Sequence, residues 1–494
     1  MSATVAAIDL GATSGRVILG GLENGKLRMN HVARFPNQPL QIHEGNRQTL
    51  HWNIAELFQR AKDGLVAGFS QSQDIVSIGV DSWAVDYALI RNGRMLGVPY
   101  HYRDARSTKA VEIVHRSISA EKLYERNGLQ HLDFNTLFQL VDERDKGFLD
   151  FAERILMIPD LFNYWLTGKQ IAESTNASTT GLLDSRTGSW DRELMELLGI
   201  PSSLFPPIAE PGDCIGRLLP EIATEVGASP NTPVISVGSH DTASAVVAVP
   251  STDSGAAFIS SGTWSLVGIE LDSPVLSKAS QEANFTNERG VDGKTRFLKN
   301  VSGMWLLSES MRTWKDSGEA DLEKLLKASA AVDTDIATFD VTDPRFAEPG
   351  DMPTRICKWF EERGLRPPAS RPELVRLIVE SLAEAYKNAL EQAEDLSGTE
   401  IQTIHIVGGG SQNELLCQLT ANRTGKTVFA GPVEATAMGN MLVQLRAVGE
   451  ISGGLDEMRS VVSNTVNPKK YSPQPADKRL LLPGSHKAVQ GKVS

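Results

Sequence analysis

The sequence reads Val237-Gly238-Ser239-His240-Asp241-Thr242-Ala243-Ser244-Ala245 at the end of an apolar run that begins at Pro233. The run predicts a short strand, and the small residues Ala243–Ala248 predict a helix directly after it. Asp241 therefore stands between a strand and a helix. Taken alone, this carboxylate has two interpretations of similar weight, a solvated helix N-cap or a group with a chemical role. The rest of the chain decides between them.

Two predicted hairpins have similar polar, glycine-bearing tips. One strand, Val5–Leu10, breaks at Gly11–Gly15 and resumes as Val17–Gly20, and another pair of strands flanks Ser261-Gly262-Thr263. Small residues let consecutive backbone N–H groups approach an anion closely, and Thr13, Ser14, Arg16 and Thr263 add hydroxyl or charged donors. Each tip alone is more typical of an ordinary β-turn. The pair in matching positions favours two phosphate-binding hairpins.

A longer repeat surrounds these hairpins. The first is followed by a helical pattern over Trp52–Phe69 and a strand over Ile75–Val80, and the second by a helix over Leu374–Leu396 and a strand over Thr403–Val407. This order predicts an α/β protein built from two divergent copies of one design. We place the boundary in the small, polar stretch after Val249, which gives an N-terminal domain over 1–249, a C-terminal domain over 250–471 and a surface tail over 472–494.

Bulk properties exclude several classes of protein. The chain has 494 residues, 41% hydrophobic and 22% charged, with a formal net charge of −12 and three cysteines. The acidic balance argues against nucleic-acid and anionic-membrane partners. The cysteines are widely separated, so neither a disulfide framework nor a zinc site is expected. No signal peptide or long apolar span is visible in the sequence, and we expect a cytoplasmic protein.

Two further motifs suit a nucleotide phosphate site. Asp9 ends a buried-looking strand, where a carboxylate needs a partner; Mg²⁺ held through water is one, and the amides of the Gly11–Gly15 turn are the alternative. Gly408-Gly409-Gly410-Ser411-Gln412-Asn413 follows a strand and precedes a helical run, so its backbone can lie flat against an adenine ring and ribose. It is not a GxGxxG fingerprint. Gly425-Lys426-Thr427 fails as a P-loop because Thr420 stands at the required earlier glycine.

Asp241 is the candidate base for transfer of a phosphoryl group to a sugar hydroxyl, since such a reaction needs a carboxylate to accept the hydroxyl proton. His240 could bond a second hydroxyl, although a structural histidine is equally compatible with the motif. Trp83 and the run Tyr102-Arg103-Asp104 could line the same pocket. For Trp83 alone, a buried core tryptophan is the preferred interpretation.

At this point the chain resembles the FGGY carbohydrate kinases, within the actin, hexokinase and heat-shock ATPase (Hsp70) superfamily, from Asp9 to about Tyr471. The motifs that carry the resemblance are Asp9–Arg16, Val80–Asp86, His101–Asp104, Met157–Leu161, Glu173–Ser178, Gly238–Thr242, Ser261–Trp264, Asn300–Gly303 and Gly408–Asn413. The resemblance implies two ribonuclease-H-like domains with a deep cleft between them, which closes over the sugar and excludes water.

The resemblance also implies an activity: ATP-dependent phosphorylation of L-rhamnulose at O1, with L-fuculose or another deoxy-ketose as the alternative substrate. Asp241 is then the general base, and Asp9 lies near Mg²⁺. The residues implied at the ketose are Trp83, Ala84, Arg103, His240, Asp241 and Thr242. The residues implied at ATP are Ala12, Thr13, Ser14, Gly15, Arg16, Thr263, Asn300, Gly409, Gly410 and Asn413. We expect a monomer or homodimer.

Two positions depart from the family pattern. Ala84 stands where relatives have glycine, so the identity of the substrate follows less firmly from the resemblance than the type of reaction does. Ser308 stands where relatives often have glutamine, so it is not counted among the ATP contacts. The alternative from another class is a non-catalytic actin-like filament protein or a sugar-sensing regulator. No basic helix-turn-helix segment is visible at either end of the sequence, and the candidate base is present, which favours the enzyme.

Overall fold

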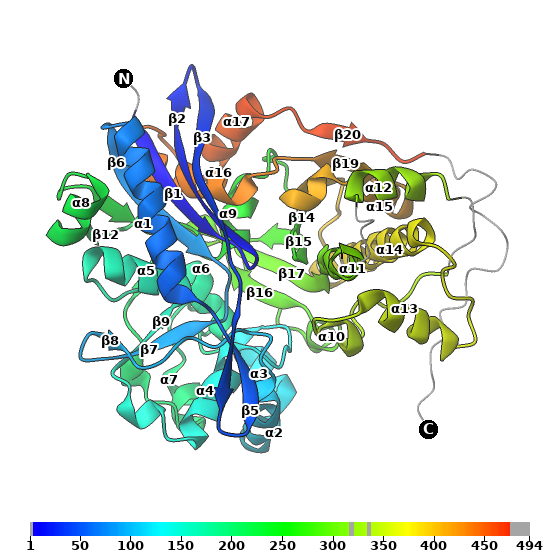
Figure 1. The fold of residues 1–494 in the computed structure, drawn as a ribbon, viewed down its shortest axis with the longest axis horizontal. Helices are drawn as coiled ribbons and strands as arrows, with labels where there is room; N and C mark the ends of the chain where they lie inside the picture. The colour runs from blue at the N-terminus through cyan, green and yellow to red at the C-terminus, as the bar shows by residue number, and fades with distance from the viewer. Residues whose placement is uncertain (1–2, 316–320, 333–336, 475–494) are drawn as a thin grey trace.

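The central strand β1 (Thr4–Leu10) is buried along six of its seven residues. Such a continuous apolar run is typical of a strand covered on both faces. The computed structural model describes residues 3–315, 321–332 and 337–474, so residues 475–494 of the predicted tail lie outside the described residues. Two mixed sheets form the framework, one in each half of the chain (Figure 1).

The N-terminal sheet has six strands around β1. Their order is β12 (Cys214–Arg217), β13 (Pro233–Ile235), β6 (Ile75–Ser82), β1, β2 (Ser14–Glu23) and β3 (Lys26–Pro36). β6 and β13 run parallel to β1 and to each other, whereas β2 and β3 run antiparallel to their neighbours. Helix α1 (Ile54–Gln71) packs on β2 and β3, and α5 (Ile158–Thr167) packs on β6.

The C-terminal sheet has seven strands around β14. Their order is β16 (Thr286–Arg289), β17 (Thr295–Ser302), β15 (Trp264–Leu271), β14 (Ala256–Ser261), β18 (Thr403–Val407), β19 (Thr427–Ala430) and β20 (Lys469–Tyr471). The long helix α14 (Arg371–Ser397) packs on β15 and β17, and α15 (Glu414–Thr424) packs on α14 and β19.

The predicted internal repeat is confirmed at the level of topology. In each half a hairpin is extended by a third antiparallel strand, and two parallel strands join the other side of its first strand. The spatial order β13-β6-β1-β2-β3 of the first half therefore matches β19-β18-β14-β15-β17 of the second. Because carboxyl ends of parallel strands meet at one edge of a sheet, each half presents its polar strand ends on one side.

Two helices in matching places lie between the sheets. Helix α9 (Asp241–Val247) follows β13, and α16 (Ala435–Ala447) follows β19. The two pack on each other, and α16 also contacts β1 and β6, so a helix from the end of the chain covers the N-terminal sheet (Figure 1). Small residues at the crossing, Ser244 on α9 and Gly439 on α16, allow this close approach.

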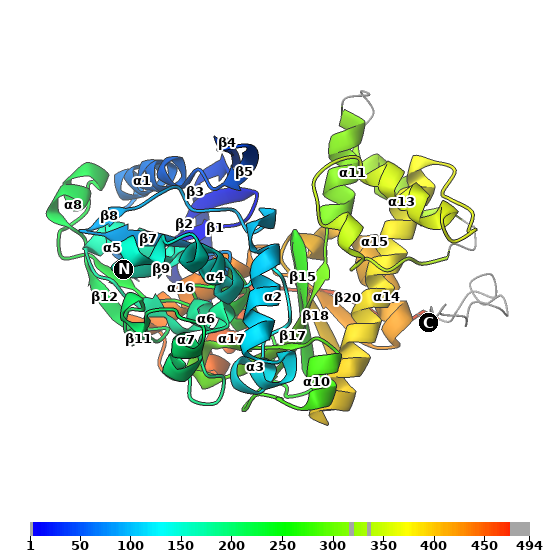
Figure 2. The same cartoon turned by 90° about the horizontal axis from the view of Figure 1, so that it is seen from below.

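The remaining elements surround the two halves, with α11 (Trp305–Lys315) and α13 (Met352–Glu361) on the outer side of the C-terminal half (Figure 2). In the N-terminal half they are β4 (Leu40–Glu44), β5 (Arg47–His51), β7 (Tyr87–Arg91), β8 (Arg94–Met95), α2 (Thr108–Ser117), α3 (Ala120–Asn127), α4 (Thr136–Asp145), β9 (Arg154–Met157), β10 (Ala172–Glu173), α6 (Ser174–Ala177), α7 (Arg192–Leu197), β11 (Ile208–Ala209) and α8 (Pro220–Val226). In the C-terminal half they are α10 (Lys278–Glu282), α11 (Trp305–Lys315), α12 (Leu322–Ala330), α13 (Met352–Glu361) and α17 (Leu455–Thr465). In the part of the chain described here, no helix combines the length and apolarity needed to cross a bilayer.

Candidate active site

Three carboxyl groups meet at the carboxyl ends of β1, β6 and β13. Asp9 and Asp81 are register partners on the parallel strands β1 and β6, and Ser82 forms a bridge with His240 just before α9. This places Asp241, the first residue of α9, one strand beyond Asp81. Asp9 and Asp81 are at most 1% exposed, whereas the Asp241 side chain is 32% exposed. Of these three groups, Asp241 is the one that a substrate can reach.

Arg16 neutralises the first of these carboxyls. It is the register partner of Asp9 on β2, and its Nε and Nη2 atoms both lie 2.8 Å from Asp9 Oδ2. Its Nη1 lies 3.2 Å from Glu434, just before α16. Burial raises the pKa of Asp9 to about 6, with Arg16 acting in the opposite direction and the charges of Asp241 and Glu434 adding to the rise.

Asp81 connects the two halves of the chain. Asn440 on α16 donates a 2.5 Å hydrogen bond to Asp81 Oδ2, and Gln444 one turn later donates to Asn440 Oδ1 and accepts from Ser77. Burial, with the neighbouring Asp9, raises the pKa of Asp81 well above its usual range. Asp81 is therefore part of a buried polar chain that ties α16 to the N-terminal sheet.

The buried side chain of Glu173 holds the turn before Asp241 in place through hydrogen bonds. Glu173 Oε2 accepts hydrogen bonds from Ser239 N at 3.1 Å, Ser239 Oγ at 2.6 Å and Thr175 Oγ1 at 2.6 Å. Thr175 in turn accepts from His240 N at 3.2 Å. Thr242 Oγ1 lies 3.2 Å from Asp241 Oδ1 and donates to it. The predicted trio His240, Asp241 and Thr242 is thus fixed in one rigid turn.

Aromatic residues form one wall beside this turn, organised by a carboxylate that the sequence did not single out. Asp86 Oδ2 accepts from Trp52 Nε1 at 2.6 Å, Trp83 Nε1 at 3.2 Å and Tyr102 N at 3.0 Å. The Trp52 and Trp83 rings lie 3.9 Å apart and are both buried. The Trp83 side chain is therefore packed in the core, and its contact with the sugar stays a prediction.

Ala84 precedes a strained residue. Val85 has a φ of +65°, a conformation that a β-branched side chain rarely adopts. Thr136 Oγ1 and Gln139 Nε2 donate to its carbonyl oxygen, and Asp86 N donates to Ala84 O at 2.9 Å. Strain of this kind persists only where the surroundings impose it, and it fixes the half-buried Ala84 in place.

The Arg103 side chain is turned toward the C-terminal half. Its guanidinium carbon lies 4.0 Å from the centre of the Trp305 ring and 5.4 Å from that of Trp264, and Nη1 donates to the carbonyl oxygen of Ala347. All three partners come from the C-terminal half. Arg103, expected at the sugar, joins the two halves through this stack.

Two of the segments implied at ATP, around Gly303 and Gly410, pack on the tip of the second hairpin. Gly262 O accepts from Met304 N at 3.0 Å and Thr263 O from Trp305 N at 3.2 Å. A Cβ on Gly410 would lie 2.0 Å from Ser261 Oγ, so the glycine loop packs directly on this hairpin. In the first hairpin, Asn37 Nδ2 donates to Gly11 O and Asn37 N to Thr13 O, which shapes the turn that carries Ala12–Gly15.

Two residues implied at ATP have structural partners here. Asn413 caps α15, accepting from Leu416 N at 3.1 Å, and is 4% exposed. Asn300 lies on β17, and its backbone N and its Nδ2 both donate to Gln130 of the N-terminal half, at 2.8 and 3.0 Å. Gly409 is exposed, with open space where a side chain would lie. The glycine loop thus exposes backbone atoms that a ligand can contact. Asn300 lies at the contact between the two halves.

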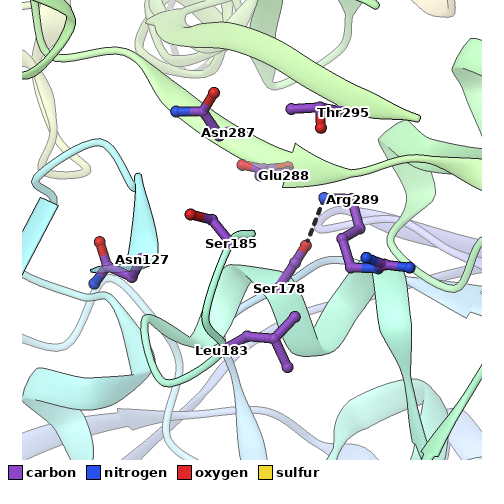
Figure 3. A pocket seen from close by; sticks show the side chains of 8 residues that line it. All are labelled: Asn127, Ser178, Leu183, Ser185, Asn287, Glu288, Arg289 and Thr295. Carbon is purple, nitrogen blue, oxygen red and sulfur yellow. Dashed lines mark hydrogen bonds between the residues drawn. The ribbon is translucent and has the colours of Figure 1, made fainter. Parts of the chain in front are cut away.

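A small cavity lies nearby between β16 and residues 178–185 (Figure 3). Its volume is about 10 Å³, the size of one water, so it is no sugar site. Arg289 N donates to Ser178 Oγ at 3.0 Å across its edge. This contact joins the edge strand of the C-terminal sheet to the N-terminal half.

Comparison with known proteins identifies this arrangement. Residues 4–248 match the N-terminal domain model, and residues 257–448 the C-terminal domain model, of the FGGY family of carbohydrate kinases. The chain belongs to the FGGY family of carbohydrate kinases. It is therefore a phosphotransferase with an alcohol group as acceptor, and the non-catalytic alternative is set aside.

Relatives cover this kinase almost end to end. A rhamnulokinase of Bacteroides thetaiotaomicron is 40% identical over 471 residues, which is 95% of either chain. A rhamnulokinase of Bacillus subtilis is 37% identical over 491 residues, or 99% of either chain. Among solved structures, a gluconate kinase from Lactobacillus acidophilus superposes with a TM-score of 0.77 at 18% identity, covering 97% of this chain and 95% of that one. The expected fold of two actin- and hexokinase-like domains is confirmed.

Several residues that shape the kinase site escaped sequence reasoning. Asp81 and Glu173 lie inside quoted motifs, but no role was given to them. Asp86 also lies inside such a motif, but its partners Trp52 and Gln139 are distant in the chain, and Asn440 was missed because its partner Asp81 is distant too. A carboxylate inside an apolar run, as at Asp81 in Ile78–Trp83, was the signal available for the first of them.

Proposed function

We propose that this kinase phosphorylates L-rhamnulose on O1, with ATP as the phosphoryl donor and Asp241 as the general base. The observation that carries the proposal is the accessibility of Asp241 beside two buried carboxyls at the carboxyl ends of the central strands. Its side chain faces outward from the start of α9, on a turn that Glu173 holds rigid. A base must meet the substrate hydroxyl, and neither Asp9 nor Asp81 is exposed enough to do so.

The proposed reaction is an in-line transfer. Asp241 accepts the proton of the O1 hydroxyl while O1 forms a bond to the γ-phosphorus, and the bond from that phosphorus to the bridging oxygen breaks, so that ADP leaves with the electron pair. The N–H groups of the first tip, Ala12–Gly15, and Thr263 of the second bind the phosphates from either side. Arg16 adds positive charge at the edge of the first hairpin.

Mg²⁺ fits the corner formed by Asp9. Magnesium usually keeps several waters and takes one or two carboxylates together with the phosphates of its nucleotide. Within residues 3–315, 321–332 and 337–474, no three acidic, histidine or cysteine side chains form an all-protein metal cage. Burial raises the pKa of Asp9 to about 6, so a nearby divalent cation would stabilise its ionised form. When bound, the ion would neutralise phosphate charge.

The choice of L-rhamnulose rests on the named activity of the relatives. The test is ADP release from ATP and Mg²⁺ with L-rhamnulose, L-fuculose, L-ribulose, L-xylulose, D-xylulose and glycerol, corrected for ADP release without sugar. We expect kcat/KM for L-rhamnulose to exceed that of every other compound. A larger kcat/KM for another ketose would overturn the substrate and leave the role of Asp241 to be tested with that sugar.

A further inference from the structure

A cavity of about 510 Å³ lies at the ends of four elements. The last residues of α9 and β15 and the first residues of β14 and α17 contribute to its lining. Asp241 begins α9, and Thr263 lies at the opposite end of the hairpin formed by β14 and β15. The cavity is therefore separate from the proposed active site. Its volume lies within the range of about 300–1,000 Å³ that holds small molecules.

The lining of this cavity is charged and acidic overall. Six acidic and two basic side chains contribute to it. Three of the acids are paired with a cation: Asp272 with Lys294, Glu270 with Arg459 and Asp292 with Arg446. The other three form no ion pair within residues 3–315, 321–332 and 337–474 and are exposed: Asp253, Asp456 and Glu457. Their negative charge disfavours an anion such as phosphate in the cavity.

Arg459 is a buried donor in the cavity wall whose hydrogen bonds are incomplete. The residue is 9% exposed, and its Nη2 donates to Val246 O at 3.2 Å and to Glu270. Its Nε–H has no partner in the described part of the chain. Because an unpartnered buried donor is costly, an acceptor brought into the cavity beside Arg459 would stabilise the protein. The fixed charge of the guanidinium also disfavours a bare cation at this wall.

Hydroxyl groups meet both demands of the lining. Each hydroxyl donates and accepts, so one can donate to an exposed carboxylate while another accepts from Arg459. A bare anion or a bare cation satisfies only one of these demands. Three apolar side chains, Val249, Phe258 and Leu455, also line the cavity and can pack against the C–H groups of a sugar.

We propose that this cavity is a second binding site, for a neutral polyhydroxylated molecule such as a monosaccharide or a sugar alcohol. The molecule binds there without being phosphorylated, because neither Asp241 nor the two hairpin tips are among the lining residues. The carboxylates of the rim accept its hydrogen bonds, and Arg459 donates to it.

The test follows the methyl resonances of Leu271 and Leu455, which both line the cavity, in ¹³C-leucine-labelled protein without nucleotide. The resonances that vanish in Leu271→Met and Leu455→Met assign them. D-Glucose, L-rhamnose and xylitol are the neutral probes, and inorganic phosphate and putrescine are the charged ones. We expect at least one neutral probe to shift these resonances with a Kd of about 10 mM or tighter. No shift with any neutral probe up to about 100 mM, or shifts with a charged probe alone, would overturn the proposal.

Ser254→Trp is the variant that fills the cavity. Ser254 is an exposed lining residue, so we expect a bulky side chain there to occupy the cavity rather than the core. The affinity for the neutral probe should fall about tenfold or more. The control is Ser203→Trp, at an exposed serine of the N-terminal half outside the cavity, which should bind the probe as wild type does. Equal affinity of Ser254→Trp and wild type would overturn the proposal.

Arg459→Lys tests the buried donor. Lysine keeps a positive charge for Glu270 but has no N–H group in place of Nε, so the probe should bind about tenfold more weakly. The control is Arg423→Lys, which changes a guanidinium paired with Glu380 and Glu384 of α14. Unchanged affinity in Arg459→Lys, or an equal loss in Arg423→Lys, would contradict the role of Arg459.

Steady-state kinetics separate this site from the active one. Ser254→Trp should leave the KM for ATP and for the phosphorylated sugar within about twofold of wild type, whichever sugar that proves to be. A rise of the sugar KM equal to the loss of probe affinity would mean that the cavity belongs to the active site, and would contradict a second site. The methyl shifts need no turnover, so they test the cavity independently of the proposed substrate.

Discussion

Gly439 on α16 lies directly against the backbone of Ser244 on α9, so that a Cβ at Gly439 would come within 1.8 Å of the Ser244 carbonyl oxygen. The contact joins the two equivalent helices of the repeat at the point where the halves meet. Since the opposing atom belongs to backbone inside a helix, it cannot turn aside as a side-chain end would. This crossing is the tightest constraint on how the two sheets approach each other through α9 and α16.

Gly439→Ala should therefore destabilise the protein strongly. We expect the added methyl to push α16 off α9 and lower the melting temperature by about 5 °C or more, as overpacking in a core does. Scanning calorimetry measures the shift. Gly97→Ala, at a glycine with open space around it, is the control and should melt within about 1 °C of wild type. Equal melting of Gly439→Ala and wild type would contradict the close crossing.

Gly410→Ala should weaken ATP use selectively. Its Cβ would meet Ser261 Oγ at 2.0 Å and shift the hairpin tip that carries Thr263. We expect the KM for ATP to rise about tenfold with the sugar KM nearly unchanged. Steady-state kinetics with each substrate varied in turn separate the two effects. A rise confined to the sugar KM would contradict a role of this loop in ATP binding.

Arg103→Ala should loosen the contact between the halves near the sugar. The stack of Arg103 on Trp305 is lost, and cation–π pairs of this kind contribute about 0.5–1 kcal/mol when partly exposed. We expect kcat/KM for sugar to fall about twofold to fivefold, with little change in melting temperature. The control is Arg363→Ala, which removes a stack at the same 4.0 Å on Trp359 of α13. An equal fall of kcat/KM in Arg363→Ala would contradict a specific role of Arg103 near the sugar.

Asp86 should make stability depend on pH. Burial raises its pKa to about 7 from 3.8, against the hydrogen bonds from Trp52 and Gln139 that lower it. A raised carboxyl pKa stabilises the fold below the unfolded value, and that contribution is lost as the pH rises through about 7. Relative to Asp86→Asn, wild type should lose up to about 4 kcal/mol of unfolding free energy between pH 4 and pH 8, at about 1.4 kcal/mol for each pH unit.

Urea unfolding of both proteins at pH 4, 6 and 8 measures this difference, because the other titrating groups are common to the two. A difference that does not change with pH would mean that Asp86 is ionised in the folded protein throughout this range. A difference of the opposite sign would mean that its hydrogen bonds outweigh burial.

The framework was predictable because it follows local patterns. The apolar run Val5–Leu10 became β1 (Thr4–Leu10), and the helical periodicity of Leu374–Leu396 became α14 (Arg371–Ser397). The convergence of Asp9 and Asp241 was foreseen through the family resemblance, and parallel strand ends bring them to one edge. Periodicity and strand order are short-range properties, and they need no knowledge of distant partners.

Contacts between side chains of the two halves could not be predicted from such local patterns. The segment Asn287-Glu288-Arg289 reads as an ordinary polar strand, and nothing local indicates that Glu288 lies behind His240. Arg103 was expected at the sugar as a charged group for the rim of the sugar, and that role stays a prediction. Its stack on Trp305 comes from a residue far away in the chain and could not be predicted from the sequence. Asn413 has a signal that was available, since an asparagine before a helical run is a common N-cap.

The central claim is that Asp241 accepts the O1 proton of L-rhamnulose. The most direct measurement is the rate of L-rhamnulose 1-phosphate formation, followed by ³¹P NMR, for wild type and Asp241→Asn, with ATP affinity measured in parallel by calorimetry. We expect the variant to bind ATP with nearly unchanged affinity and to form product about 10²–10⁴-fold more slowly, the usual contribution of a general base. Product formation near the wild-type rate, or phosphate on another hydroxyl, would contradict the account.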